Sequence, residues 1–373
     1  MNSLLSATTH VLYTYLLKPI FFLFDPESVH NQNVLAGKTL GKIPFAKKCI
    51  DWMWAYHNPK LTKTLDGITF PNPVGLSAGF DYNGDLSDIL PSVGFGFHTI
   101  GTITLQSYAG NHPPRLGRFP RSRALLVNKG LKNAGAVAII KKLKKCRFEI
   151  PTGISIASTN QHFASEKKQI EDIFECFYLF ETSHLRHAYY ELNISCPNLI
   201  GNVEFYSPSH LNQLLQFLSK ITLSRPVFIK MPISKTNEEI DSMMNVIIQY
   251  PFIKAVIIGN LWQNRNNQSL YPDEVSKFKS GNFSGIPCQK RSDELIRLVY
   301  KKYGSMIKII GCGGIFSAID AYRKIKLGAS LTQLMTGLIF EGPQLVYEIN
   351  KNLVRLLRAD GYDSISNAIG IDA

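Results

Sequence analysis

The sequence predicts a (β/α)8 barrel that follows a helical extension. Eight short runs rich in β-branched residues alternate with amphipathic helical segments over about 300 residues, as is typical of this fold. Polar or glycine-rich residues follow these runs, and in a barrel they would meet at one end. We therefore expect an extension over residues 1–60 and a barrel over residues 61–373. The alternative is an open doubly wound sheet, but there the glycine-rich turn would follow the first run rather than the seventh.

The extension contains a strongly apolar segment, residues 11–24, that is short for a membrane span and is interrupted at Lys18-Pro19. Two helices lying in a membrane interface fit this pattern, and the alternative is a helix packed on the barrel. No secretory signal is visible, and a mitochondrial presequence would be rich in arginine, whereas the first arginine is Arg115. We expect a monomeric, peripheral protein on the cytoplasmic face of a prokaryotic cell membrane rather than at the mitochondrial inner membrane.

Composition narrows the possible partners. The 373 residues carry a formal net charge of +13, which suits anionic ligands or an anionic membrane surface. The lysines are scattered without an aromatic-interleaved basic module, so no nucleic-acid partner is expected. The six cysteines form no C-x-x-C pair, which indicates a reducing compartment, no disulfide framework and no metal site.

The barrel elements follow in order along the chain. Residues 65–73 predict a short hairpin ahead of the first barrel strand. The eight strands are predicted at 74–76, 98–101, 153–156, 190–194, 227–231, 255–259, 307–311 and 331–335. Amphipathic helices are predicted between them, for example over 238–249, 293–302 and 319–327.

The fourth run ends in the most informative motif, in which Asn193 and Asn198 flank the thiol of Cys196. A buried structural cysteine is the plainer interpretation, but the polar ends of the other runs favour a catalytic thiol. Lys230 ends the fifth run and is expected to face the same site, because a lysine is rarely buried unpaired. A solvated loop lysine is the alternative.

The seventh run is followed by a glycine-rich turn, residues 311–315, and the eighth by Thr336. Glycines let backbone N–H groups approach a phosphate closely, and barrels often build a phosphate site from these two loops. We therefore expect a phosphate group beside Gly313, Gly314 and Thr336.

Taken together, the motifs are similar to those of one family. They are residues 24–30, 70–81, 93–97, 100–104, 114–115, 193–198, 284–285, 311–315, 328–331 and 342–343. On these the chain resembles the membrane-associated, quinone-linked dihydroorotate dehydrogenases from about residue 16 to residue 355. The resemblance implies FMN-dependent oxidation of (S)-dihydroorotate to orotate in pyrimidine biosynthesis, with electrons passed to a membrane quinone.

The resemblance also implies roles for individual residues. Cys196 would remove the C5 proton of the substrate while FMN accepts hydride from C6. FMN would contact Ala78, Gly79, Thr102, Ser155, Asn193, Lys230, Gly285, Gly313, Gly314, Met335 and Thr336. The substrate ring would lie among Asn128, Asn193, Asn198, Asn260 and Tyr82, and the quinone near His30 and Arg118.

Several positions depart from the family pattern. The quinone-linked class has a serine base where Cys196 stands, and a lysine that touches flavin and substrate where Tyr82 stands. The substrate loop, residues 128–133, has its glycine one position early, and either Lys129 or Lys132 would restore the missing charge. Ser155, Leu261 and Met335 replace an asparagine, a threonine and a tyrosine of the family. The rival functions are therefore a related flavin enzyme with another cyclic imide or a soluble acceptor, and an inactive flavin-binding membrane protein.

Overall fold

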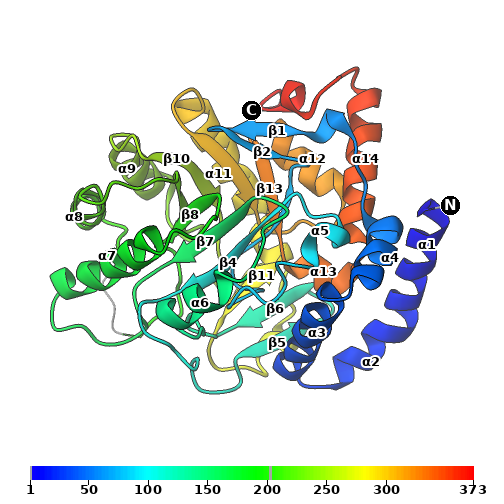
Figure 1. The fold of residues 1–373 in the computed structure, drawn as a ribbon, viewed down its shortest axis with the longest axis horizontal. Coiled ribbons are helices and arrows are strands. Elements are labelled where there is room, and N and C mark those ends of the chain that lie inside the picture. The colour runs from blue at the N-terminus through cyan, green and yellow to red at the C-terminus, as the bar shows by residue number, and fades with distance from the viewer. Residues whose placement is uncertain (1, 201–203) are drawn as a thin grey trace.

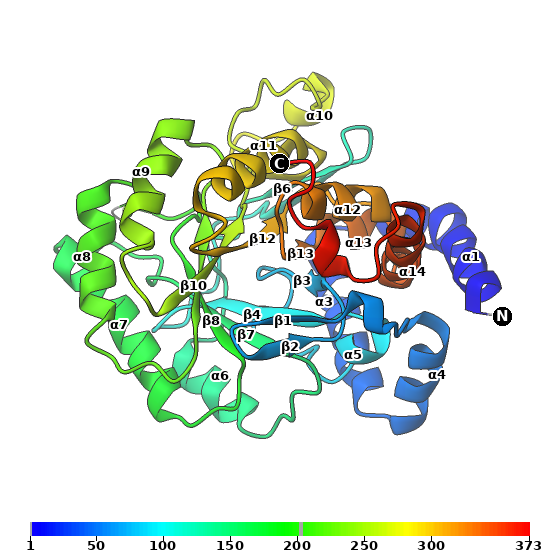
Figure 2. The same cartoon turned by 90° about the horizontal axis from the view of Figure 1, so that it is seen from above.

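A computed structural model describes residues 2–200 and 204–373. Eight parallel strands close into a barrel whose spatial order follows the chain, and helices surround it (Figures 1 and 2). The (β/α)8 prediction is confirmed. The strands are β3 (Val74–Leu76), β4 (Phe97–Ile103), β7 (Thr152–Ile156), β8 (Tyr189–Asn193), β9 (Val227–Met231), β10 (Ile253–Ile258), β12 (Lys308–Cys312) and β13 (Leu331–Leu334).

The predicted strands all exist, with ends displaced by no more than about two residues. Helices cover the outside of the barrel, and their starts follow local capping. Thr236 and Glu239 form a reciprocal capping box at the start of α9, and Ser317 caps α12. The helices of the barrel are α5 (Leu90–Val93), α6 (Ala136–Leu143), α7 (Glu166–Thr182), α8 (Pro208–Leu218), α9 (Asn237–Ile247), α10 (Pro272–Val275), α11 (Ile286–Tyr303), α12 (Ala318–Lys326), α13 (Thr336–Glu341) and α14 (Leu345–Ala359).

The amino end of the barrel is closed by the predicted hairpin, β1 (Lys63–Leu65) and β2 (Ile68–Phe70). Phe70 packs in one apolar cluster with Phe97 and Tyr189, which lie on barrel strands. Gly75 and Gly153 make room for these rings, because a Cβ there would lie 2.4 Å from Phe97 and 2.2 Å from Tyr189. Side chains therefore fill the barrel interior at its amino end, and only the carboxyl end is open for a site.

A three-stranded antiparallel sheet lies beside that open end, and the sequence did not predict it. It consists of β5 (Leu116–Phe119), β6 (Ala124–Val127) and β11 (Asn282–Gly285). Each strand has four residues, and β11 comes from a segment more than 150 positions from β6, so local periodicity does not reveal the pairing. The sheet carries Arg118 and Gly285 and leads directly into the loop after β6.

The extension is helical, but it does not break at Pro19. Residues 2–23 form one rod made of α1 (Asn2–Leu12), a π-helical turn (Tyr13–Leu17) and α2 (Lys18–Leu23). The amide of Lys18 bonds the carbonyl of Tyr13, and this wider turn accommodates a proline that would clash in a regular α-helix. The predicted interruption is thus a widened turn inside a continuous helix.

The second half of the extension packs on the barrel. Asp25 caps α3 (Pro26–Gly41), which is followed by α4 (Pro44–Trp54). Ile50 of α4 belongs to the same apolar core as Leu86 and Ile89. Within the described residues, no helix is long and apolar enough to cross a membrane. Short 3-10 turns at Pro59–Leu61 and Ile365–Ala368 complete the described structure.

Candidate active site

Three adjoining cavities lie at the carboxyl end of the barrel. The central cavity is lined by residues that include Ala78, Gly79, Tyr82, Thr102, Lys129, Lys132, Asn193, Cys196, Asn198, Lys230, Asn260 and Met335. The glycine cavity shares Ala78, Lys230, Asn260 and Met335 with it and adds Gly285, Gly313, Gly314 and Thr336. Neither lining contains an Asp or Glu among the described residues, whereas three lysines face the central cavity. Both cavities therefore favour anions.

The third cavity is an apolar tunnel between the extension and the sheet β5–β6. It is lined by Tyr13, Leu17, Phe21, Phe22, Pro26, Val29, His30, Arg118, Leu338 and others. It shares five residues with the central cavity: His30, Phe80, Leu116, Leu125 and Ile339. A ligand in the tunnel and a ligand in the central cavity would thus be separated by a single layer of side chains.

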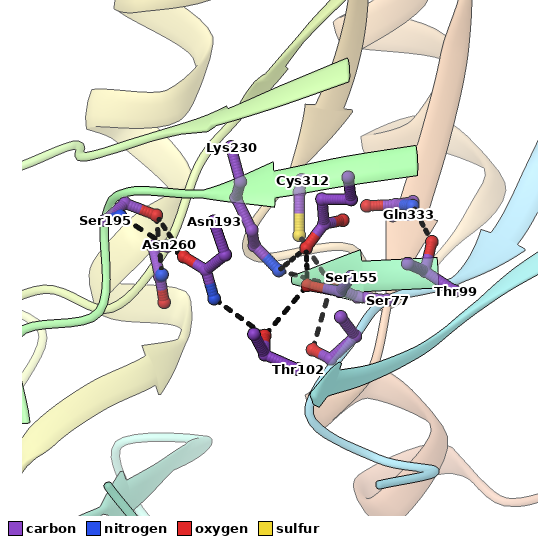
Figure 3. A network of polar contacts seen from close by, with 12 residues as sticks. Ser77, Thr99, Thr102, Ser155, Asn193, Ser195, Lys230, Asn260, Cys312 and Gln333 are labelled. Carbon is purple, nitrogen blue, oxygen red and sulfur yellow. Dashed lines mark hydrogen bonds and ion pairs between the residues drawn. The ribbon is translucent and has the colours of Figure 1, made fainter. Parts of the chain in front are cut away.

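A polar network crosses the barrel end and orients the amide of Asn193 (Figure 3). Its Nδ2 donates to Thr102 Oγ1 at 2.8 Å, and its Oδ1 accepts from Ser195 Oγ at 3.1 Å. Asn260 Nδ2 donates to the same Ser195 hydroxyl at 2.8 Å. The donor and acceptor sides of Asn193 are therefore set by the protein, which fixes how it presents itself to a ligand.

Beneath this network lies a buried ion pair. Lys230 Nζ is 3.9 Å from Glu191 Oε1 and 3.0 Å from Ser77 Oγ, and the glutamate side chain is fully buried. Ser155 donates to Glu191 at 2.7 Å and bonds Thr102 at 2.8 Å. Glu191 Oε2 has no hydrogen-bond partner among the described residues. Lys230 therefore presents a positive charge to both cavities, whereas the carboxylate of Glu191 lines neither of them.

Cys196 lies just after β8 and lines the central cavity. Burial raises the pKa of its thiol to about 11, while a backbone hydrogen bond from Asn198 and the charge of Lys230 act in the opposite direction. The thiol is therefore protonated at neutral pH, and Lys230 is the nearby cation that favours the thiolate.

The glycine cavity brings together Gly313, Gly314 and Thr336, the residues at which the sequence predicts a phosphate. Gly313 and Gly314 have φ values of +109° and +70°, and a Cβ on Gly314 would lie 2.3 Å from Cβ of Gln289. Gly285 immediately precedes the 18-residue helix α11, whose amino end carries a positive dipole. Thr336 Oγ1 lies 2.8 Å from Ser284 Oγ, which places two hydroxyls at the same wall.

Tyr82 lines the central cavity and packs against His30, which lines both the central cavity and the tunnel. Their ring centroids are 5.3 Å apart, and His30 also meets Phe80 edge-on. Burial lowers the pKa of His30 to about 3, so the ring is neutral, and its Nε2 has no partner among the described residues. Lys129 Nζ donates a hydrogen bond to the Tyr82 hydroxyl.

Arg118 lines the tunnel as expected, but its guanidinium is engaged by the extension. It donates to the carbonyls of Phe21 at 2.9 Å and Phe24 at 2.8 Å, which end α2, and it lies over the ring of Phe22. Tyr13 adds a second attachment through its hydroxyl, which donates to the carbonyl of Ile339 at 2.6 Å. These contacts hold the apolar rod over the tunnel.

Two of the predicted site residues do not line the cavities. Ser155 lies beneath them in the Glu191 network, and the Asn128 side chain bonds Asn111 and Ser280. The other predicted flavin, substrate and quinone residues all line one of the three cavities. Glu191 was not predicted as a site residue from the sequence, although an acidic residue inside an apolar strand is a visible signal.

Glu27 was also missed. This residue of α3 accepts from Lys132 Nζ at 2.9 Å and pairs with Arg115 at 3.2 Å. His30 lines the central cavity and Glu27 pairs with Lys132 of its wall, so the extension does more than lead to the site. The motif over residues 24–30 includes Glu27 but did not indicate this role, because its partners are Arg115, just before β5, and Lys132, in the loop after β6.

Comparison with known proteins settles the family. The family model described as dihydroorotate dehydrogenase matches residues 60–357. The chain belongs to the dihydroorotate dehydrogenase family. This confirms the family inferred from the sequence motifs.

Relatives of this dihydroorotate dehydrogenase family member match over nearly their whole length. A protein of Sulfurovum sp. named dihydroorotate dehydrogenase (quinone) is 34% identical over 95% of this chain and 97% of its own length. A protein of Trichodesmium erythraeum with the same name is 32% identical over 96% and 98%. The crystal structure of an Eimeria tenella DHODH in complex with ferulenol superposes with a TM-score of 0.82 at 25% identity, covering 93% of this chain and 96% of that one.

Proposed function

We propose that this protein is an FMN-dependent dihydroorotate dehydrogenase that oxidises (S)-dihydroorotate to orotate in pyrimidine biosynthesis and passes the electrons to a membrane quinone. The names of the full-length relatives support the reaction and the acceptor. The observation that carries the proposal is the shared wall of the tunnel and the central cavity, which joins an apolar entrance to an anion-favouring barrel end.

The residues present fit FMN. The glycine cavity offers hydroxyls, glycine backbone and the start of α11 for a phosphate, and Lys230 supplies a cation between the two cavities. Ala78, Gly79, Thr102 and Met335 line the space beside it. Bound FMN would supply the hydride acceptor of the reaction. Ser155 would act beneath it, by holding Thr102 and Glu191 in place.

The amide side chains that line the central cavity bind the substrate in this proposal. Asn193, Asn198 and Asn260 can each donate and accept, which matches the alternating N–H and C=O groups of a cyclic imide. Asn198 is positioned by Asn282, which donates to its Oδ1 at 2.7 Å. Asn128 would serve this site by its contact with Asn111, which in turn bonds the Asn198 carbonyl at 3.1 Å.

Cys196 is proposed as the base that takes the C5 proton. It lines the central cavity beside two of these amides, and Lys230 is the cation that stabilises its thiolate. Cys196 must first release its own proton to solvent, which is uphill at neutral pH because burial raises the thiol pKa. The thiolate then takes the C5 proton, while hydride leaves C6 for the bound FMN.

Membrane docking is proposed for the extension. Of the 21 large apolar side chains that are exposed in the described structure, 14 lie between residues 4 and 52. Residues 1–60 also carry six lysines against three acidic residues, which suits an anionic leaflet. Burial of this face in one leaflet would open the tunnel toward lipid-soluble quinone. We propose peripheral attachment at the cytoplasmic face, by a protein that acts as a monomer.

The decisive experiment mixes flavin-loaded protein with dihydroorotate in the absence of oxygen and follows the yellow absorbance of the flavin. We expect bleaching, followed by recovery when a soluble quinone is added. Bleaching by another cyclic imide alone would indicate a different substrate, and recovery only with a water-soluble acceptor would exclude the quinone. If no substrate bleaches a fully loaded protein, it is a binding protein rather than an enzyme.

A further inference from the structure

Three lysines line the central cavity, and two of them already have anionic partners. Lys132 Nζ lies 2.9 Å from Glu27, and Lys230 Nζ lies 3.9 Å from Glu191. Lys129 differs, because no carboxylate in the described structure pairs with it. Its one hydrogen-bond partner there is the hydroxyl of Tyr82, and its Nζ lies 4.4 Å from the centre of that ring.

Lys129 is also buried, with 6% of its surface exposed. Burying an ammonium group without an anionic partner lowers the stability of the fold. Here that group lies beside a cavity lined by amides. Burial, together with the positive charges of Lys132 and Arg115, lowers the pKa of Lys129 to about 8, although the negative charge of Glu27 opposes the shift. A buried cation of this kind is stabilised when an anion enters the cavity.

The loop after β6 is built to hold Lys129 in this position. Gly130 has a φ of +65°, and a Cβ there would lie 2.2 Å from Asn111 and 2.6 Å from Asn160. Asn160 donates to the Gly130 carbonyl at 3.1 Å, and Asn133 donates to the Leu131 carbonyl at 2.9 Å. The early glycine therefore produces a tight, well-bonded turn in which Lys129 is enclosed and Lys132 is left to meet Glu27.

We propose that Lys129 binds the carboxylate of dihydroorotate and orotate, with the Tyr82 hydroxyl orienting its ammonium group. The inference rests on the proposed function, because it assumes that the central cavity receives this anion. It selects Lys129 over Lys132 as the residue that restores the missing positive charge. The family resemblance implies a lysine where this chain has Tyr82, after the first barrel strand. In this proposal Lys129, from the loop after β6, provides that positive charge instead.

Lys129→Met and Lys132→Met form a matched pair for the test, since both residues come from one loop and line one cavity. Orotate is titrated into each flavin-loaded protein, and its affinity is read from the change in the flavin spectrum. Loss of a charge-assisted hydrogen bond should weaken orotate binding about 10- to 100-fold in Lys129→Met. Lys132→Met should bind orotate within about threefold of the unaltered protein. Uracil has the same ring without the carboxylate, so its affinity should be almost equal in all three proteins.

A rescue variant separates loss of charge from loss of structure. Tyr82→Lys combined with Lys129→Met restores an ammonium group beside the position of the lost one, because Tyr82 touches Lys129, and it should recover most of the orotate affinity. Equal orotate affinity in Lys129→Met and the unaltered protein would overturn the inference and leave the proposed function standing. An equal loss in Lys132→Met, or an equal loss for uracil, would also overturn it, because the loop and not the charge would then be responsible. If the unaltered protein binds no orotate, the proposed function fails, and the inference fails with it.

Discussion

The pKa of Cys196 leads to the most exacting prediction. A thiol with a pKa of about 11 is four pH units from ionisation at pH 7, so about one molecule in ten thousand carries the thiolate. Forming that thiolate costs about 5 kcal/mol, which must be part of the barrier if Cys196 is the base. At saturating dihydroorotate, we therefore expect the rate of flavin reduction to rise about tenfold for each pH unit between pH 7 and pH 10.

The assay is rapid anaerobic mixing across this pH range, with the flavin absorbance as readout. Saturating substrate is needed because Lys129, with a pKa of about 8, loses its charge in the same range and would weaken binding. Cys196→Ala should bind flavin and orotate normally but show no reduction at any pH. Cys196→Ser should be slower throughout, because a hydroxyl ionises at still higher pH than a thiol. A flat profile in the unaltered protein would refute the reasoning, since deprotonation of Cys196 would then not contribute to the rate.

Three further predictions follow from buried charge, the glycine cavity and the extension. In flavin-free protein, Lys230→Met should lower the free energy of unfolding by about 3–5 kcal/mol, because it leaves Glu191 buried and unpaired. Adding Glu191→Gln should restore most of that loss in denaturant melts. Thr336→Asp should weaken FMN binding at least about tenfold in a fluorescence titration, while Thr336→Ser should not, because only the carboxylate repels a phosphate. Leu4, Tyr15 and Leu23 are exposed apolar residues of the extension, and replacing all three with serine should release the protein from anionic vesicles. The same variant should reduce quinone more slowly, whereas its flavin reduction by dihydroorotate should not change. Serine at Val137 and Ile319, which are similarly exposed on the barrel, is the control and should leave vesicle binding unchanged.

Removal of the whole extension should affect the central cavity as well as the tunnel, because His30 lines that cavity and Glu27 pairs with Lys132 of its wall. The apolar rod over residues 2–23 touches the tunnel, whereas α3 contributes to the wall of the central cavity itself. Quinone reduction should therefore depend on the whole extension. Flavin reduction by dihydroorotate should tolerate changes on the rod but respond to changes at Glu27, because that residue pairs with Lys132, which lines the central cavity.

The sequence by itself determined the barrel, the order of its strands and most of the cavity lining. Strand runs and amphipathic helices are local patterns that the sequence shows directly. Because a closed parallel barrel brings every strand end to the same place, Asn193, Lys230 and Gly314 could be assigned to one site from the sequence alone. The family motifs at the same strand ends then indicated the cofactor and the reaction.

Only the tertiary structure decided which groups carry charge into the site. Lys129 and Lys132 are three positions apart and equivalent in the sequence, but Glu27 from α3 neutralises one and leaves the other. The sheet β5–β6–β11, the raised pKa of Cys196 and the buried pair of Glu191 and Lys230 depend in the same way on residues far apart in the chain. Pairing and desolvation are properties of the surroundings of a side chain, and those surroundings exist only once distant segments have packed together.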